Sequence, residues 1–220
     1  MSASHDHSVK FDGMSASYKR RLWAVIVINA TMFAVEMTAG RLAASQALQA
    51  DALDFFADAL TYGLSLAVIG KAVATRSLAA LFKGLSLLAM GLWVFGSTLY
   101  AVFVTGVPEA EIMGAIGFLA LLANLASVLL LVAYKDGDAN VRSVWLCSRN
   151  DAIGNVAVMI AAMAVWGTQT GWPDVIVAGI MAGLFLSSSL QILRQAWAER
   201  GAEPGAEHET DGEATHDHSR

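Results

Sequence analysis

Ala50-Asp51-Ala52-Leu53-Asp54-Phe55-Phe56-Ala57-Asp58 places three aspartates inside an apolar run that covers residues 46–70. An ionisable side chain at membrane depth costs about 2.5–3.5 kcal/mol on insertion scales, so three acids in one such run need a compensating partner. Asp54 and Asp58 are four residues apart, which places them about 40° apart on one face of a helix. The stretch therefore predicts a membrane helix that presents carboxylates to a cation.

Apolar runs long enough to cross a bilayer, about 20 residues each, occur six times in the chain. They cover residues 22–40, 46–70, 77–104, 112–134, 142–166 and 173–193. The 220 residues are 56% hydrophobic and only 15% charged, whereas soluble domains carry about 25% charged residues. The predicted fold class is therefore all-α, a polytopic membrane protein with six transmembrane helices.

The basic residues next to these runs indicate their orientation, because cytoplasmic loops carry an excess of Lys and Arg. One side of the predicted bundle has ten of them: Lys10, Lys19, Arg20, Arg21, Lys71, Arg76, Lys135, Arg142, Arg194 and Arg200. The opposite side has only Arg41. Both termini are therefore predicted to be cytoplasmic, in an inner (plasma) membrane of bacterial type. Residues 19–198 would form the transmembrane domain.

The two tails, residues 1–18 and 199–220, are predicted to be disordered because they lack apolar periodicity. The tail from Glu199 onward has seven acidic and two basic residues, which accounts for the whole formal charge of −5. The tails also hold two His-Asp-His motifs, which either collect metal ions near the entrance or are merely solvated. Their histidines are His5, His7, His216 and His218.

Several function classes find no support in the sequence. No basic patch indicates a nucleic-acid partner. All five histidines lie in the tails, so no nucleophile has a histidine beside it in the predicted spans. No glycine-rich phosphate-binding loop is present either. The chain is therefore predicted not to be an enzyme and to use no organic cofactor.

A second pair of candidate ligands lies in the run 142–166. Cys147, the only cysteine, and Asp151 repeat the four-residue spacing. The runs 46–70 and 142–166 would cross the membrane in opposite directions, so they can pack antiparallel with both pairs at similar depth. Three carboxylates and one thiol suit tetrahedral Zn²⁺, and the thiol favours softer ions such as Cd²⁺. The predicted metal ligands are Asp54, Asp58, Cys147 and Asp151.

The charge of this ligand set predicts a mechanism. Three carboxylates and a thiolate would bring four negative charges to one ion of charge +2. Without metal, some of these groups must hold protons, because like charges so close together cannot all ionise in a poor dielectric. Metal entry would then displace protons. We therefore expect a metal–proton antiporter that exposes its site alternately to the two sides of the membrane.

Structural explanations for the same residues remain open. An acid in a membrane helix can pair with Lys83 or Arg149, and Cys147 can be a small packing residue. Four further polar residues are candidate accessory or pathway positions: Asp51, Asn29, Glu36 and Asn124. Asn29 and Glu36 share one face of the first run, where Asn29 can line the cation path or hydrogen-bond to Asn124. Asp51 can be a gate, a packing hydrogen bond or a water-exposed group.

These residues resemble the cation diffusion facilitator family, whose members export Zn²⁺ and related ions from the cytoplasm. The resemblance covers nearly all of residues 15–198. It rests on Asn29 and Glu36–Gly40, on the segment 50–58, on Ala123-Asn124 and on Cys147-Ser148-Arg149-Asn150-Asp151-Ala152-Ile153-Gly154-Asn155. The family carries His or Asp, three residues and Asp in span two, and usually His, three residues and Asp in span five. The resemblance implies that Asp54, Asp58 and Asp151 are metal ligands.

Two departures from the family pattern affect what the resemblance implies. Cys147 stands where the family usually has a histidine, which leaves the preference among Zn²⁺, Cd²⁺ and Co²⁺ open. Most members also continue into a cytoplasmic ferredoxin-like domain that binds metal and dimerises, whereas this chain is expected to be a short form. A homodimer would then have to form through the membrane helices. The remaining rivals are an exporter of small organic cations and a non-transporting membrane protein that senses metal or scaffolds a partner.

Overall fold

The computed structural model describes residues 15–68, 73–104, 106–135 and 139–202. Side chains are described for these residues except at 73–77, 139–147, 149 and 198–202. The tail histidines and the side chain of Cys147 therefore lie outside the described part of the protein.

The described residues form six α-helices and one short 3-10 turn, and they contain no strand. The helices are α1 (Ala16–Leu42), α2 (Gln46–Val68), α3 (Val73–Val104), α4 (Ala110–Leu131), α5 (Ala139–Thr168) and α6 (Trp172–Ala202), with the turn η1 (Val132–Tyr134) after α4. The predicted all-α fold class is confirmed. Most helices are longer than the apolar runs, because the polar residues that flank the runs continue the helices.

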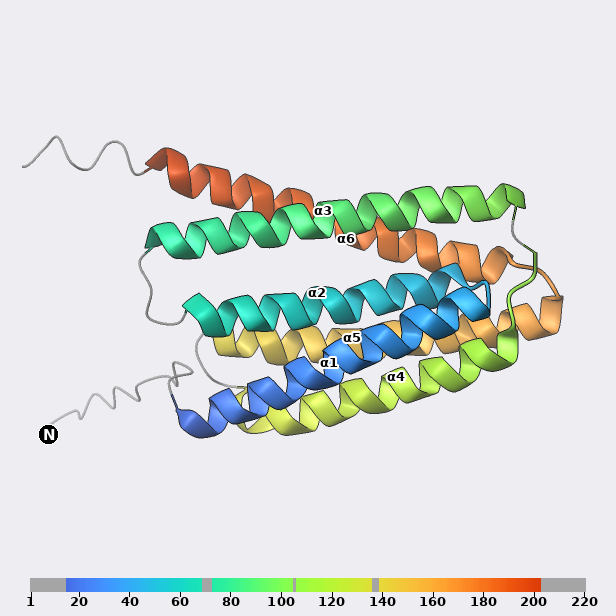
Figure 1. Cartoon of the computed structure of the whole chain (residues 1–220), viewed down its shortest axis with the longest axis horizontal. Helices are drawn as coiled ribbons and strands as arrows, with labels where there is room; N and C mark the ends of the chain where they lie inside the picture. The colour runs from blue at the N-terminus through green and yellow to red at the C-terminus, as the bar shows by residue number, and fades with distance from the viewer. Residues whose placement is uncertain (1–14, 69–72, 105, 136–138, 203–220) are drawn as a thin grey trace, which may run out of the picture.

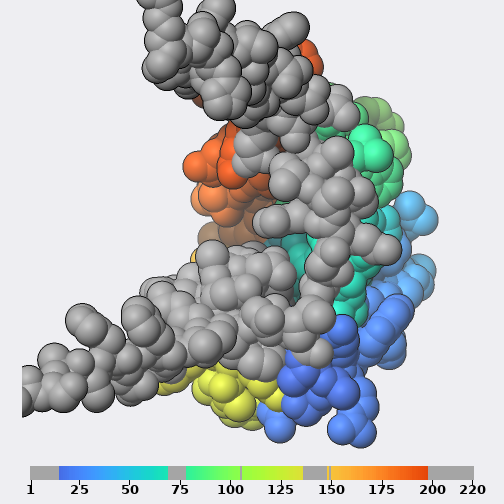
Figure 2. All heavy atoms as spheres, turned by 90° about the vertical axis from the view of Figure 1, so that its left-hand side faces the viewer, coloured from blue at the N-terminus to red at the C-terminus, as the bar shows by residue number. Residues whose placement is uncertain are grey.

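The helices run alternately up and down along one long axis (Figure 1). The start of α1 and the end of α6 lie at the same end of the bundle, together with the α2–α3 and α4–α5 connections. We call this end the terminal end and the other the hairpin end. Figure 2 looks onto the terminal end, where α6 in orange and α1 in blue lie on opposite sides of the described atoms.

Helix α3 packs mainly against α6, while α1, α2, α4 and α5 form a separate group of four. Two glycines of α3 let it approach α6 closely. A Cβ added at Gly84 would lie 2.9 Å from Leu193, and one added at Gly91 would lie 3.0 Å from Leu186. The four-helix group and the α3–α6 pair meet along α2 and along α5, which also packs against α6. At this junction, Ala57 of α2 packs with residues of α3 and α6.

Gly179 and Gly183 form a small-xxx-small pattern on α6, which predicts close helix packing either within one chain or between two copies. An added Cβ would meet nothing within 4 Å at either residue. Neither glycine therefore packs closely against another described helix of the same chain, and packing between two copies stays a prediction. The close packing of α6 instead uses glycines on its partner α3.

Five of the described helices are long and apolar enough to cross a membrane. The spans are Ala16–Leu42, Leu78–Val104, Ala110–Tyr134, Asn150–Thr168 and Trp172–Trp197. Helix α2 is not among them, since every stretch of 18 residues within it contains Asp51, Asp54 and Asp58. The sixth predicted span thus depends on whether these acids have partners inside the bundle.

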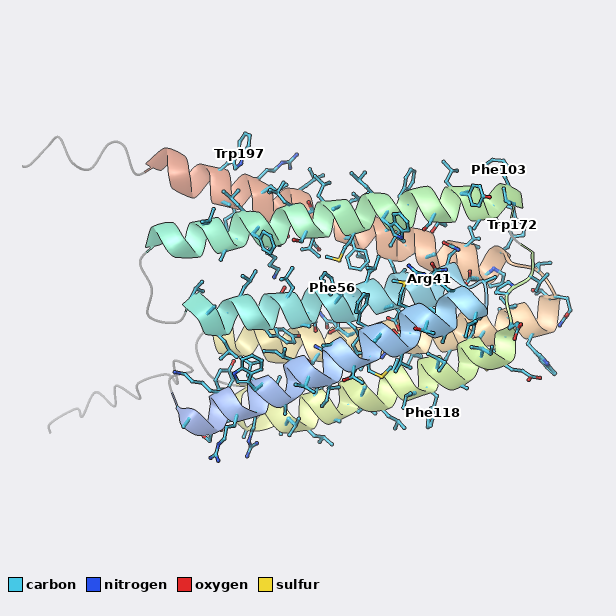
Figure 3. The ribbon with its side chains drawn as sticks, in the orientation of Figure 1. Arg41, Phe56, Phe103, Phe118, Trp172 and Trp197 are labelled. Atoms are coloured by element: carbon cyan, nitrogen blue, oxygen red, sulfur yellow. The ribbon has the colours of Figure 1, made fainter. Side chains whose placement is uncertain are left out.

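Large apolar side chains cover the outside of the bundle, as expected of a protein surrounded by lipid. Figure 3 shows labelled aromatic side chains projecting away from the helices. Among them, Phe103 is 80% exposed and Trp197 is 73% exposed. The polar side chains that are buried lie between the helices, so the chain has its apolar residues outside and several polar residues inside.

Candidate metal site

A pocket of about 300 Å³ lies where α2 meets α3, α5 and α6. Three of the predicted ligands line it: Asp54, Asp58 and Asp151. The pocket's other polar residues include Thr61, Lys83 and Gln191, which lie in the halves of α2, α3 and α6 nearer the terminal end. The pocket therefore extends from the middle of the bundle toward the terminal end.

The three carboxyl groups face one another across the gap between α2 and α5. Asp151 is close enough to interact with both Asp54 and Asp58. Within the described side chains, however, no group of three or more His, Cys, Asp or Glu is arranged tightly enough to hold a metal ion. Carboxylates that share a pocket repel one another, so such a set is expected to close around a cation only when the cation is bound.

Asp58 has a further neighbour, Tyr62, that orients it. The hydroxyl of Tyr62, one turn later on α2, donates a hydrogen bond to the Asp58 carboxylate. The same hydroxyl lies 3.4 Å from the Oγ of Ser148 on α5. Tyr62 therefore links Asp58 to α5 on the side of the acids nearer the terminal end. The sequence analysis did not identify this role.

Lys83 is the one basic residue among those that line the pocket. It lies on α3 and interacts electrostatically with Asp58. The sequence had offered Lys83 as a possible structural partner of a buried acid. Lys83 lines the same pocket as the three acids. The other suggested partner is Arg149, whose side chain is not among those that the structure describes.

The four accessory candidates lie between α1, α2 and α4 and are all buried. They are Asn29, Glu36, Asp51 and Asn124, each no more than 2% exposed. The carboxyl groups of Glu36 and Asp51 are close enough to interact. Neither polar atom of Asn29 has a hydrogen-bond partner among the described residues. The suggested hydrogen bond from Asn29 to Asn124 is therefore not formed in this structure.

A narrow recess separates this buried group from the pocket. It is lined by Asp51, Asp54, Phe55, Asp58, Asn124 and Asp151, and it leaves no room for a water molecule. Phe55 is 4% exposed and packs with Met32 and Ala120. Toward the hairpin end, the pocket acids are thus sealed from Asp51 and Asn124 by close packing.

A further acid that contacts α2 from another helix is Asp174, which the sequence analysis missed. It lies at the start of α6 and is 2% exposed. Its carboxylate accepts hydrogen bonds from Ser45 Oγ at 2.6 Å, from the Gln46 backbone N–H at 2.7 Å and from the Ala47 backbone N–H at 3.0 Å. Asp174 therefore caps the N-terminus of α2 from a different helix, where a negative charge is favoured.

The chemistry of the pocket follows from its donors. Carboxylate oxygens bind divalent cations over a range of hardness. The thiol of Cys147, one turn before Asp151 on α5, would add a soft ligand if its side chain turned toward the acids. The aromatic residues next to the acids in the sequence do not form a cage in the pocket, since Phe55 lines the closed recess and Phe56 is 39% exposed on the outside.

Comparisons with known proteins find similarity to cation efflux proteins. The model of the cation efflux transmembrane domain matches residues 22–199. The chain is 26% identical over 216 residues to the metal cation efflux system protein CzcD of Cupriavidus metallidurans, covering 86% of this chain and 64% of that protein. It is 28% identical over 212 residues to the zinc transporter ZitB of Escherichia coli, covering 90% of this chain and 64% of that protein. The chain thus spans slightly less than two thirds of the length of these relatives.

Proposed function

Since the chain belongs to the cation efflux family, we propose that it is a membrane transporter that exports divalent metal ions, with Zn²⁺ as the main cargo and Cd²⁺ or Co²⁺ as further candidates. The observation that carries this proposal is the shared pocket of Asp54, Asp58 and Asp151. Three acids facing one another in apolar helices are costly unless a cation joins them. Similar proteins are named for metal cation efflux and zinc transport.

The metal would bind between α2 and α5. Asp54 and Asp58 supply ligands from α2, Asp151 supplies one from α5, and Cys147 completes a tetrahedral set. Tyr62 holds Asp58 in place through its hydroxyl, and such hydrogen bonds to ligands orient the ligands of metal sites. Binding would draw the acids together, because the ion replaces their mutual repulsion with a shared attraction.

Export would proceed by alternating access with proton antiport. The pocket extends toward the terminal end, where the positive residues of the chain predict the cytoplasm. The recess toward the hairpin end is closed. This arrangement fits a state that loads metal from the cytoplasm, with all six helices crossing the membrane and both termini inside. Release on the opposite side would follow a movement of the α3–α6 pair relative to the other four helices, and protons would take the place of the metal on the acids.

Zinc flux into proteoliposomes under an imposed pH gradient tests the proposal. The native chain should carry zinc, and the flux should follow the gradient at clamped voltage. Asp54→Ala and Asp151→Ala should each abolish it. Glu109→Gln is the matched control, because Glu109 is an exposed acid that caps no N–H with its side chain.

Each failure of this experiment has a separate meaning. Flux that ignores the pH gradient would exclude proton coupling. Flux that survives both alanine variants would make the carboxylates structural. No flux of zinc, cadmium or cobalt with the native chain would overturn metal export, and organic cations would then be tested.

A further inference from the structure

Lys83 places a positive charge inside the pocket that also holds the three acids. The acids come from α2 and α5, whereas Lys83 comes from α3. The charge and the acids therefore belong to the two parts of the bundle that pack as separate groups. Lys83 interacts electrostatically with Asp58, so its effect reaches one of the proposed metal ligands directly.

The packing of α3 against α6 fixes the direction of Lys83. Its neighbour Gly84 is pressed against Leu193, with room for no Cβ, and the Gly84 carbonyl accepts a hydrogen bond of 3.0 Å from Ser189 Oγ. Successive residues of a helix are about 100° apart, so Lys83 is turned away from this contact. Leu87, one turn later on the same face, lines the pocket as well.

An ammonium group in this position cannot be a metal ligand, because it has three donors and no lone pair. It acts on the site only through its charge. The three carboxylates and the Cys147 thiolate proposed as the fourth ligand would carry −4, Lys83 carries +1 and a divalent ion carries +2, so the occupied pocket would keep a charge of −1. Without Lys83 that charge would be −2 in the middle of an apolar bundle, where an uncompensated charge is expensive.

We propose that Lys83 is a tethered counter-cation of the metal site, which offsets part of the negative charge of the ligands and weakens the binding of the divalent ion so that the ion can leave. Like charges that share one pocket in a protein repel strongly enough to change an affinity by about tenfold or more. This inference rests on the proposed function, since it assigns a role to Lys83 at the same metal site. A transporter needs this compromise, because binding must be favourable enough for entry and weak enough for release.

The test is the dissociation constant of Zn²⁺ for the purified full-length chain, measured by competition with a zinc-binding dye. Lys83→Met removes the charge and keeps the length of the side chain, and it should tighten zinc binding by at least about tenfold. Lys83→Arg keeps the charge and should leave the constant within about threefold of native. Lys135→Gln removes an exposed cation outside the pocket and should have no effect.

Zinc flux into proteoliposomes provides a second test of the same variants. Tighter binding should lower the zinc concentration that half-saturates flux in Lys83→Met, and slower release should lower the maximal flux. Unchanged or weaker zinc binding in Lys83→Met, with native binding that Asp54→Ala abolishes, would overturn the role of Lys83 alone. If the native chain bound no divalent metal at all, the proposed function would fail instead. Size-exclusion profiles that match the native protein exclude misfolding as the cause.

Discussion

The N-terminus and the middle of α2 both lie beside aspartates, but the partners of these aspartates differ. Asp174 is buried, whereas Asp54 and Asp58 are half-buried. At the N-terminus of α2, Asp174 accepts three hydrogen bonds, one from a hydroxyl and two from the backbone. In the middle of the helix, Asp54 and Asp58 face Asp151 across a pocket of about 300 Å³. The first carboxylate is satisfied by the protein itself, whereas the second group leaves a net negative charge for something else to neutralise.

This difference teaches that burial alone does not mark an acid as part of a cation site. A carboxylate that meets backbone N–H groups and a hydroxyl stabilises the fold. A carboxylate whose nearest neighbours are other carboxylates destabilises the fold unless a cation or protons join it. Substitutions should therefore separate the two regions, with transport lost in one and stability lost in the other.

The largest effect is expected in the pocket. Asp58→Asn keeps the size of the side chain and an acceptor for Tyr62 but removes a charge from the proposed metal site. Even the outer partners of metal ligands contribute 10- to 100-fold to affinity or activity, so zinc flux should fall by about 100-fold or more. The unfolding midpoint in detergent should not decrease, because the variant relieves repulsion between acids. A clear loss of stability with retained flux would place Asp58 among the structural acids.

At the other region, Asp174→Ala should lower the free energy of unfolding by about 3 kcal/mol or more. It leaves three buried donors without an acceptor, and each such loss costs about 1–3 kcal/mol. Asp174→Asn keeps one acceptor oxygen and should cost less. A denaturant titration monitored by circular dichroism gives both values. Equal stability of the native chain and Asp174→Ala would mean that water replaces the carboxylate at the end of α2.

Ser45→Ala should have a smaller effect in the same region. The Ser45 hydroxyl donates to Asp174 and accepts from the Leu48 backbone N–H at 3.1 Å, which is the N-cap arrangement. Loss of such a cap costs about 0.5–2 kcal/mol. The same titration measures it, and Ser45→Thr serves as the control that keeps the hydroxyl. If Ser45→Ala were as damaging as Asp174→Ala, the hydroxyl would hold the aspartate in place as well as cap the helix.

Glu36→Gln should have the smallest effect on stability. The Glu36 carboxyl group lies close to that of Asp51, so the amide removes an acidic neighbour of Asp51 and can still donate a hydrogen bond to it. The free energy of unfolding should stay within about 1 kcal/mol of native, the scale of one hydrogen bond, or rise, because one of two neighbouring buried acids becomes neutral. A fall of more than about 1 kcal/mol would show that Glu36 has a partner in the protein, and it would then belong with Asp174.

The sequence by itself determined the helical class and the chemistry of the pocket. Apolar runs of membrane length predict helices without reference to packing, and five of the six described helices meet the apolar criterion. The four-residue spacing of Asp54 and Asp58 placed them on one helix face because helical periodicity is local. The sequence also predicted that Asp151 lies near them, because antiparallel helices place Asp54, Asp58 and Asp151 at similar depth.

Only the tertiary structure decided which polar residues meet. Asp174 and Ser45 are 129 residues apart along the chain and hydrogen-bonded, and Lys83 reaches the acids from α3. The glycines that pack α3 against α6 within the chain are Gly84 and Gly91. The physical reason is that contacts between helices depend on how each helix is rotated and paired. Local periodicity fixes which residues share a face, but not which neighbour that face will meet.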